Sequence, residues 1–205
     1  MICAHLDKLV TAVKLFSYGL VAADWKCLST LLHLSSDNMP LSAGDTAPDF
    51  RSSDEEGNEI TLSEVAKKGF VALYFYPKDE TPGCTAEAKC FRDNWDSLKS
   101  FRVSVIGVSS DTAERHKSFR AHHSLQFPLI SDTDRKLRRL YGAEGLIIPA
   151  RITFLIDSDM KIRLVHNSQL NPKSHVEVIK RFLEEHTHRS EQGDNGQNNR
   201  DQANR

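Results

Sequence analysis

Cys84 is the residue whose type and place in the chain are best suited to chemistry. An apolar run at 70–76 predicts a buried strand, and the loop that begins at Pro77 delivers Cys84 to the start of a predicted helix. Unpaired N–H groups and the positive end of the dipole at a helix N-terminus stabilise a thiolate. Because the thiolate is the nucleophilic form of cysteine, the sequence predicts a reactive thiol rather than one that only packs.

Residues beside Cys84 are suited to assist such a thiol. Pro82 and Gly83 sharpen the turn into the helix. Thr81 can place its hydroxyl beside the sulfur, where a hydroxyl can donate or accept a hydrogen bond. Pro77 can shield one side of the pocket from water. These residue types therefore favour a small, partly shielded pocket around the sulfur.

The rest of the pattern alternates strands and helices that must position this loop. Besides 70–76, apolar runs predict strands at 103–108 and 127–130, then a hairpin at 151–157 and 161–165. Helices are predicted for 64–68, 84–99, 112–122, 132–141 and 173–185. The expected helix ends are Ser63 and Asp111 or Thr112 as N-caps, with Gly142 as a terminator. This order predicts an α/β fold, a central mixed β-sheet flanked by helices on both faces.

The composition indicates one globular domain with two unlike ends. The chain has 205 residues, a net charge of −1, 39% hydrophobic and 27% charged residues, which excludes a bulk basic nucleic-acid binder. The alternating pattern fills 39–186. Residues 187–205 hold no large apolar side chain and are expected to be a disordered polar tail. Residues 1–38 are expected to be an N-terminal extension: an amphipathic appendage, sequence upstream of a start at Met39, or a weak targeting segment.

The residues around Cys84 also carry a family resemblance. Pro77, Thr81 and Cys84 are spaced as in the active-site pattern of peroxiredoxins, and the wider text resembles the Q-type branch, also called bacterioferritin comigratory protein. The matching stretches are GDTAPDF (44–50), FYPKDETPGCT (75–85), EA (87–88), FRD (91–93), VIGVSSD (105–111), FPLISD (127–132) and ARITFLID (150–157). This resemblance covers about 39–185 and implies a thioredoxin-like fold and thiol-dependent reduction of hydrogen peroxide and organic hydroperoxides.

The resemblance implies a role for each matching residue. Cys84 corresponds to the peroxidatic cysteine, which attacks the peroxide and becomes a sulfenic acid, and Thr81 to the threonine that hydrogen-bonds peroxide and thiolate. Pro77 corresponds to the shielding proline. Arg151 corresponds to the arginine that lowers the thiol pKa and orients peroxide. A charge at the start of an apolar strand needs a partner, so a structural ion pair is the alternative for Arg151, and Arg92 is expected in a supporting position.

The second cysteine departs from the family pattern. Many Q-type members carry a resolving cysteine five residues after the peroxidatic one, but that position is Lys89 here and Cys90 comes one residue later. Six helical residues rise about 9 Å, whereas a disulfide needs Cα atoms within about 7 Å, so a Cys84–Cys90 bond requires the helix to unwind. Cys90 is thus a possible resolving residue, a one-cysteine cycle with an outside thiol is an equal alternative, and Cys3 or Cys27 is a further one.

No metal or other cofactor is predicted. His116, His122 and His123 lack the spacing of a metal site and are expected to be surface histidines of a helix. A dithiol reductase is disfavoured because the sequence has no Cys-x2-Cys.

The expected partners are a peroxide and thioredoxin or a similar thiol reductant, without nucleic acid or stable membrane insertion. The expected protein is a cytoplasmic monomer or weak dimer. Two other classes stay open. A non-catalytic thioredoxin-like binding or chaperone module would explain the fold but not Thr81, Cys84 and Arg151 together. A membrane-associated redox protein anchored by residues 6–22 would explain the extension.

Overall fold

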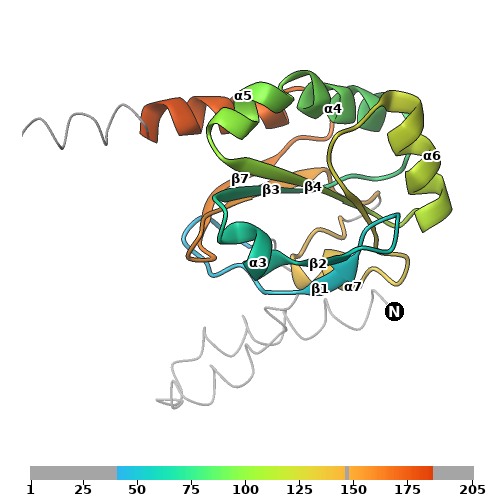
Figure 1. Ribbon diagram of the computed structural model, residues 1–205, viewed down its shortest axis with the longest axis horizontal. Coiled ribbons are helices and arrows are strands. Elements are labelled where there is room, and N and C mark those ends of the chain that lie inside the picture. Colours follow the sequence, from blue (N-terminus) through green and yellow to red (C-terminus); the bar gives the residue numbers. More distant parts are fainter. Residues whose placement is uncertain (1–40, 146–147, 187–205) are drawn as a thin grey trace, which may run out of the picture. The chain divides into compact units, whose positions relative to one another are not determined.

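The computed structural model describes residues 41–145 and 148–186, which form a mixed five-stranded sheet and a separate two-stranded hairpin (Figure 1). The sheet order is β5-β4-β3-β6-β7. β4 pairs in parallel with both β3 and β5. β6 pairs antiparallel with both β3 and β7. These strands are β3 (Phe70–Phe75), β4 (Val103–Ser109), β5 (Leu129–Ser131), β6 (Ile152–Ile156) and β7 (Ile162–Asn167). The predicted mixed sheet and its final hairpin are confirmed.

β3 is the central strand because it is apolar on both of its faces. Val71, Leu73 and Phe75 belong to one hydrophobic cluster, and Ala72 and Tyr74 belong to the other. Alternate side chains of a strand point to opposite faces, so a continuous apolar run fits a position with helices above and below. The end of this strand, where the loop to Cys84 begins, is therefore held rigidly.

Helices cover both faces of the sheet, as the sequence predicted. α4 (Pro82–Asp93), α5 (Trp95–Ser100) and the helix at 174–186 pack on the face that holds Tyr74, and α6 (Ala113–His123) contributes Phe119 there. α3 (Leu62–Ala66) and α7 (Lys136–Leu140) pack on the opposite face (Figure 1). The helix that carries Cys84 thus packs on the sheet through a continuous hydrophobic layer.

The single helix predicted over 84–99 is wrong: the structure has two helices, α4 and α5, which meet at Asn94. Asn94 has φ −103° and ψ 11°, and its side-chain amide donates to the Cys90 carbonyl at 2.9 Å. An asparagine side chain that bonds the backbone competes with the helical ladder. The helix that carries both cysteines therefore ends at Asp93, three residues after the second one.

Two distant aspartates cap helices whose starts were predicted differently. Ser63 is not the N-cap of α3, which starts after Thr61, because the Ser63 hydroxyl donates to Asp49 instead, at 2.6 Å. Asp132 accepts from the backbone amides of Leu137 and Arg138 at 2.9 Å each, so α7 begins later than predicted. Carboxylates at these positions satisfy the unpaired N–H groups of a first turn. The Thr112 cap of α6 is as predicted.

One hairpin was not predicted, namely β1 (Arg51–Ser53) with β2 (Glu59–Thr61). The strands are short and half exposed, so they lack the apolar run by which the others were found. The expectations for residues 1–38 and 187–205, with Cys3 and Cys27, lie outside the described residues. Within the described ranges, no helix is long and apolar enough to cross a membrane.

Candidate active site

Cys84 lies in the first turn of α4, where the sequence placed it. The helix starts after Thr81 with Pro82 as its first residue. Proline suits this position because its missing N–H has no partner to lose and its φ is already helical. The thiol is 1% exposed and belongs to the cluster beside Tyr74 and Phe91. The sulfur therefore sits in an apolar wall at the positive end of a helix, next to the sheet.

Arg151 is the cation that reaches this sulfur. It immediately precedes β6, and β6 pairs with β3 so that Ile152 lies opposite Phe75, the last residue of β3. The Arg151 side chain donates from Nη2 to Cys84 Sγ at 3.4 Å. A Cβ on Gly83 would lie 3.0 Å from the same nitrogen, so the glycine gives the guanidinium room. Sheet pairing and a small residue thus bring together two residues that are 67 positions apart.

Glu87 holds the other branch of the guanidinium. It lies one turn after Cys84 on α4, is fully buried, and accepts a hydrogen bond from Arg151 Nη1. Burial raises the pKa of Glu87 to about 8, although the Arg151 charge opposes the rise. For Arg151, burial lowers the pKa, but Glu87 and Cys84 outweigh burial and raise it. The arginine therefore stays charged and is fixed between a carboxyl and the thiol.

His175 closes the site from the helix at 174–186. Its Nδ1 lies 3.5 Å from Glu87 Oε1 and 2.8 Å from the Thr153 hydroxyl, and its Nε2 lies 3.1 Å from the Ser168 carbonyl. A carbonyl only accepts, so Nε2 carries the proton and Nδ1 accepts from Thr153. Burial lowers the pKa of His175 to about 4. The imidazole is neutral at neutral pH, and the cation beside the thiol is Arg151.

Arg138 ties the two halves of the site through backbone carbonyls. This fully buried arginine of α7 donates to Tyr76 O at 2.7 Å, to Ala143 O at 2.9 Å and to Ala150 O at 3.1 Å. Tyr76 comes just before the Cys84 loop, and Ala150 just before Arg151. Charge-assisted bonds of this kind are short and stronger than neutral ones. Arg138 therefore fixes the spacing between the two segments that carry the thiol and its cation.

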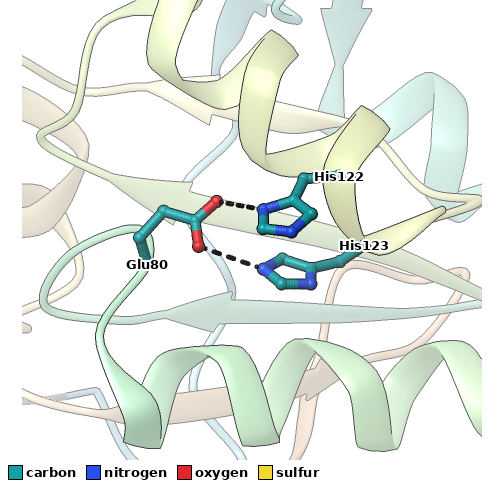
Figure 2. A group of neighbouring side chains, drawn as sticks. All are labelled: Glu80, His122 and His123. Carbon is teal, nitrogen blue, oxygen red and sulfur yellow. Dashed lines mark hydrogen bonds and ion pairs between the residues drawn. The ribbon is translucent and has the colours of Figure 1, made fainter.

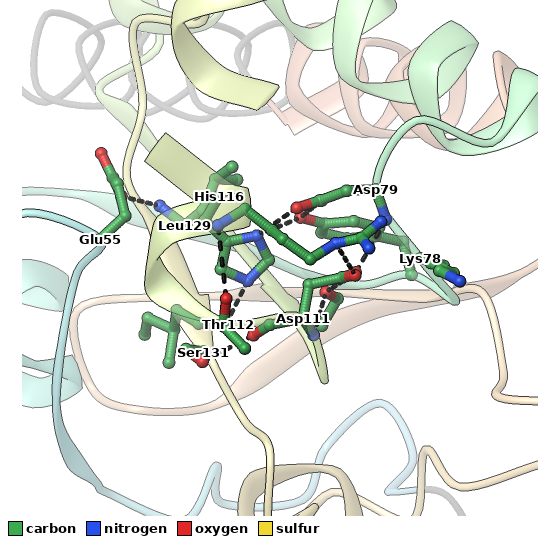
Figure 3. A network of polar contacts seen from close by, with 12 residues as sticks. Glu55, Lys78, Asp79, Asp111, Thr112, His116, Leu129 and Ser131 are labelled. Atoms are coloured by element: carbon green, nitrogen blue, oxygen red, sulfur yellow. Dashed lines mark hydrogen bonds and ion pairs between the residues drawn. The ribbon is translucent and has the colours of Figure 1, made fainter. Parts of the chain in front are cut away.

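A buried polar network anchors the loop from below (Figure 3). Asp79 accepts from the Tyr76 hydroxyl at 2.7 Å, lies 2.7 Å from His116 Nδ1, and donates its backbone N–H to Asp111 at 2.8 Å. The second His116 nitrogen faces the Ile130 carbonyl at 3.2 Å. Because a buried polar group without a partner is costly, this network holds the loop 77–81 in one place against α6.

The expectation that the three histidines of α6 are surface residues is wrong for two of them. His116 is fully buried and His123 is 7% exposed, whereas the His122 side chain is 67% exposed. His116 is buried because it pairs with Asp79 from the loop. His123 packs edge-on against Phe119, with ring centroids 4.9 Å apart. The Asp79 partner of His116 is 37 positions away, so no local sequence signal announces it.

The other predicted site residues differ in their contacts. The Thr81 hydroxyl donates to the Lys78 carbonyl at 3.0 Å, within the loop. Pro77 is half-buried, two residues after the end of β3. Arg92 binds Asp93 and donates to the His123 carbonyl at 2.9 Å. The contacts of Arg92 tie α4 to the end of α6.

Cys90 shares α4 with Cys84 but faces different surroundings. Both thiols are free in the described structure, and Cys90 is half-buried. Its sulfur lies 3.8 Å from the Lys173 carbonyl and 3.9 Å from the Asn94 amide. Burial raises the pKa of this thiol, and the carboxylates of Glu177 and Asp93 raise it further. Cys90 is thus turned toward the chain that enters the helix at 174–186.

The chain is similar to known proteins over most of its described length. Residues 43–165 match the model of the AhpC/TSA family. The chain is 36% identical over 166 residues to a chloroplastic peroxiredoxin Q of Sedum lineare, covering 80% of this chain and 89% of the relative. It is 37% identical over 147 residues to that of Suaeda salsa, covering 70% and 68%.

Solved structures give the same result. Peroxidoxin BcpB of Mycobacterium tuberculosis superposes with a TM-score of 0.67 at 34% identity, covering 70% of this chain and 97% of the other. A PrxQ mutant of Xylella fastidiosa superposes with a TM-score of 0.67 at 29% identity, covering 72% and 98%. The chain therefore belongs to the AhpC/TSA family and has the thioredoxin-like fold of peroxiredoxins. Within that family it is a peroxiredoxin of the Q type, as its sequence indicated, and hence a thiol-dependent peroxidase.

Sequence reasoning missed several residues that build the site, namely Glu87 as the ion-pair partner, Arg138, His175, Asp79 and His116. Each is polar and buried, and each has a partner far away in the sequence. A charged residue inside an amphipathic pattern, such as Glu87 between Cys84 and Ala88, is the one local signal that could have been followed.

Proposed function

We propose that Cys84 is the nucleophile of this peroxidase and that Arg151 is its principal electrostatic partner. The single observation that supports the assignment is the 3.4 Å contact between Arg151 Nη2 and Cys84 Sγ in a buried site. A guanidinium beside a thiol favours the thiolate form. In water-excluded surroundings such a contact acts more strongly than it does in water.

The first half of the cycle is attack on the peroxide. The Cys84 thiolate bonds to one peroxide oxygen, the O–O bond breaks, and Cys84 becomes a sulfenic acid. The other oxygen leaves with the bonding electron pair and takes a proton, giving water or an alcohol. Arg151 lies where it can stabilise the charge that grows on that oxygen, which lowers the barrier more than it stabilises bound peroxide.

Thr81 and Pro77 take supporting roles in this proposal. Thr81 is the N-cap residue of the helix that carries Cys84, and its hydroxyl donates one hydrogen bond, to the Lys78 carbonyl. A hydroxyl rotates freely and can turn to a bound peroxide. Pro77 has no N–H and so adds no competing donor at the rim of the pocket.

The second half of the cycle is resolution of the sulfenic acid, for which we assign Cys90. Cys84 is 1% exposed, so any thiol partner has to wait until the first turns of α4 open. Once they open, a thiol on the same helix has a large advantage in effective concentration over a separate molecule. Cys90 then attacks the Cys84 sulfur, a disulfide forms and water leaves. An external dithiol, thioredoxin or a similar donor, reduces the disulfide and is itself oxidised.

The substrate range follows from the same pocket and from one relative. A bacterioferritin comigratory protein of Xanthomonas campestris, 27% identical, is described by its alkyl peroxide reduction activity. We assign hydrogen peroxide and organic hydroperoxides to this chain on that basis and on its apolar walls. The unit that acts is assigned to residues 39–186.

Residues 1–38 are assigned no part in the chemistry. A cytoplasmic location is the proposal from the sequence, and the chloroplastic relatives make targeting by 1–38 the alternative. Fluorescent fusions with and without this segment decide between the two.

Treatment of the reduced protein with one equivalent of peroxide, followed by mass-spectrometric mapping, tests the proposal. The expected product is a Cys84–Cys90 disulfide, preceded by a sulfenic acid on Cys84. A lasting Cys84 sulfenic acid with Cys90 free would overturn the resolving step and leave a one-cysteine cycle. Oxidation at another cysteine, with Cys84 unchanged, would overturn the assignment of the nucleophile.

A further inference from the structure

Three potential metal ligands meet beside the active-site loop (Figure 2). Glu80 Oε1 lies 3.1 Å from His122 Nδ1, and Glu80 Oε2 lies 3.2 Å from His123 Nε2. One ligand atom from each of the three residues can be chosen so that these atoms all lie within 4.8 Å of one another. The glutamate comes from the loop that leads to Cys84, and the histidines end α6. The sequence separates them by 42 and 43 positions, so no ligand spacing is visible in it.

We propose that Glu80, His122 and His123 form a binding site for a divalent transition metal ion, Zn²⁺ in the first instance. Two imidazoles and one carboxylate are a ligand set that Zn²⁺ takes, with a solvent molecule in the fourth position. Metal–ligand bonds of about 2.0–2.1 Å in a tetrahedron put neighbouring ligands about 3.3 Å apart. The two nitrogen–oxygen separations, which involve different oxygens of the Glu80 carboxylate, are each close to that edge. A small shift of flexible side chains therefore admits the ion.

The surroundings favour a cation at this point. The negative end of a helix dipole lies at its C-terminus, and α6 is an 11-residue helix whose last two residues are the histidines. Arg92 binds the Asp93 carboxylate and the His123 backbone carbonyl, and neither contact uses a ligand atom of the cluster. Each imidazole offers a lone pair to the ion when its proton sits on the other ring nitrogen.

Burial of one ligand gives the site a fixed side. The His123 side chain is 8% exposed and packs on Phe119, whereas the Glu80 and His122 side chains are 44% and 67% exposed. One ligand is thus held in place by the core and two reach the ion from the surface. Solvent has access to the fourth coordination position on the exposed side, so a bound ion can exchange with ions in solution.

A metal ion at this site would be bonded to the loop that leads to Cys84. Glu80 directly precedes Thr81 and lies four residues before Cys84. An ion bound to it and to α6 would tie the loop down and oppose opening of the first turn of α4. This consequence rests on the proposed function, in which that opening precedes disulfide formation. Metal binding itself does not depend on it.

Calorimetric titration of the full chain with Zn²⁺ tests the site. The protein is used without a histidine tag and with Cys84→Ser, so that the reactive thiol does not compete. Binding of one equivalent is expected, weakened at least tenfold by Glu80→Gln and by His122→Gln. His166→Gln, which changes a histidine of β7 outside the cluster, is the matched control and should bind as the parent does.

Tetrahedral Co²⁺ spectra provide a second measurement that does not rely on heat. The parent should show visible absorption bands that both cluster variants lose. Equal Zn²⁺ affinity in the parent and both variants would overturn the site, whatever the enzyme does. If binding holds, Zn²⁺ should slow Cys84–Cys90 disulfide formation in the wild type and not in His122→Gln. Equal slowing in both proteins would leave the Zn²⁺ site standing but overturn the proposed effect of bound Zn²⁺ on the loop.

Discussion

The two thiols of α4 stand in opposite electrostatic surroundings, although one helix carries both. Cys84 lies at the positive end of the helix with the Arg151 guanidinium 3.4 Å from its sulfur. Cys90 lies in the last turn, and burial together with Glu177 and Asp93 raises its pKa. The more buried of the two thiols is the one in contact with a guanidinium, so burial alone does not decide the electrostatic surroundings of a thiol on this helix.

The proposed cycle uses the two thiols at different steps. In it, Cys84 reacts with peroxide first, and Cys90 reacts once the helix opens and its surroundings change. While the helix is intact, Cys90 Sγ lies 3.8 Å from the Lys173 carbonyl. The proposal therefore assigns the first step to folded α4 and the second to opened α4.

Replacing Cys84 by serine should have the largest effect. The sulfur is the only atom of the site proposed to bond to peroxide, so peroxidase activity should fall to the uncatalysed background. Thioredoxin-coupled peroxide consumption measures it, and Cys90→Ser is the matched control, which should keep the first turnover. Activity retained without Cys84 would remove the contrast between the two thiols.

Replacing Arg151 by methionine should have the next largest effect. The loss of one fixed donor for developing charge is expected to lower the rate constant of Cys84 oxidation by about 10²–10³-fold, or about 2.7–4 kcal/mol. Stopped-flow measurement of the first turnover gives this value directly. Removal of the guanidinium also leaves Glu87 buried without its partner, which destabilises the fold.

The double variant with Glu87→Gln separates the two effects of Arg151. It should recover part of the lost stability, because a neutral amide replaces the unpaired carboxyl, while activity stays low. If activity returned together with stability, Arg151 would be a structural residue only and the 3.4 Å contact would carry no chemistry.

The sequence could predict what local patterns determine. The strand, loop and helix that present Cys84 follow from an apolar run, Pro77 and a helix start. Arg151 was found through the family resemblance. The break at Asn94 was missed because it depends on a side chain that bonds the carbonyl of Cys90.

Long-range polar pairs could not be predicted in this way. His116 is buried because Asp79, 37 positions earlier, meets it across the fold. His175 reaches Glu87 only when the helix at 174–186 packs on α4. Helical periodicity treats such residues as surface, because it registers polarity and not the partner that makes burial acceptable.

Moving the second thiol by one position should give a smaller change. In Lys89→Cys/Cys90→Lys the cysteine is rotated by about 100° around the helix axis and takes the five-residue spacing that the family resemblance implies. Disulfide formation should change by up to about tenfold, because the closed helix holds the thiol differently, while Cys84 oxidation stays the same. Rapid-quench mapping after one equivalent of peroxide measures both steps. A change in the first step would mean that the two ends of α4 are electrostatically coupled.

The smallest effect should be a pH dependence of stability caused by Glu87, which lies near Cys84 on α4. The folded-state pKa of Glu87, about 8, lies above the ordinary value of 4.5, so the folded chain binds the extra proton between these values. The contribution of Glu87 to stability is therefore fully present below pH 4.5 and is lost as the pH rises to about 8. His175, with its pKa of about 4, acts oppositely, but only below about pH 6.5. Between pH 6.5 and 8.5, Glu87 is therefore the one of these two residues whose titration changes the free energy of unfolding.

Urea unfolding at pH 6.5 and 8.5 measures that slope. The wild type should lose about 1–2 kcal/mol across the interval, and Glu87→Gln should lose less because the amide does not titrate. Cys90→Ser is the control for the other end of α4, and it should keep the wild-type slope. An equal slope in Glu87→Gln would show that Glu87 is already ionised at neutral pH, and the guanidinium would then be shared between two anions rather than directed at the thiolate.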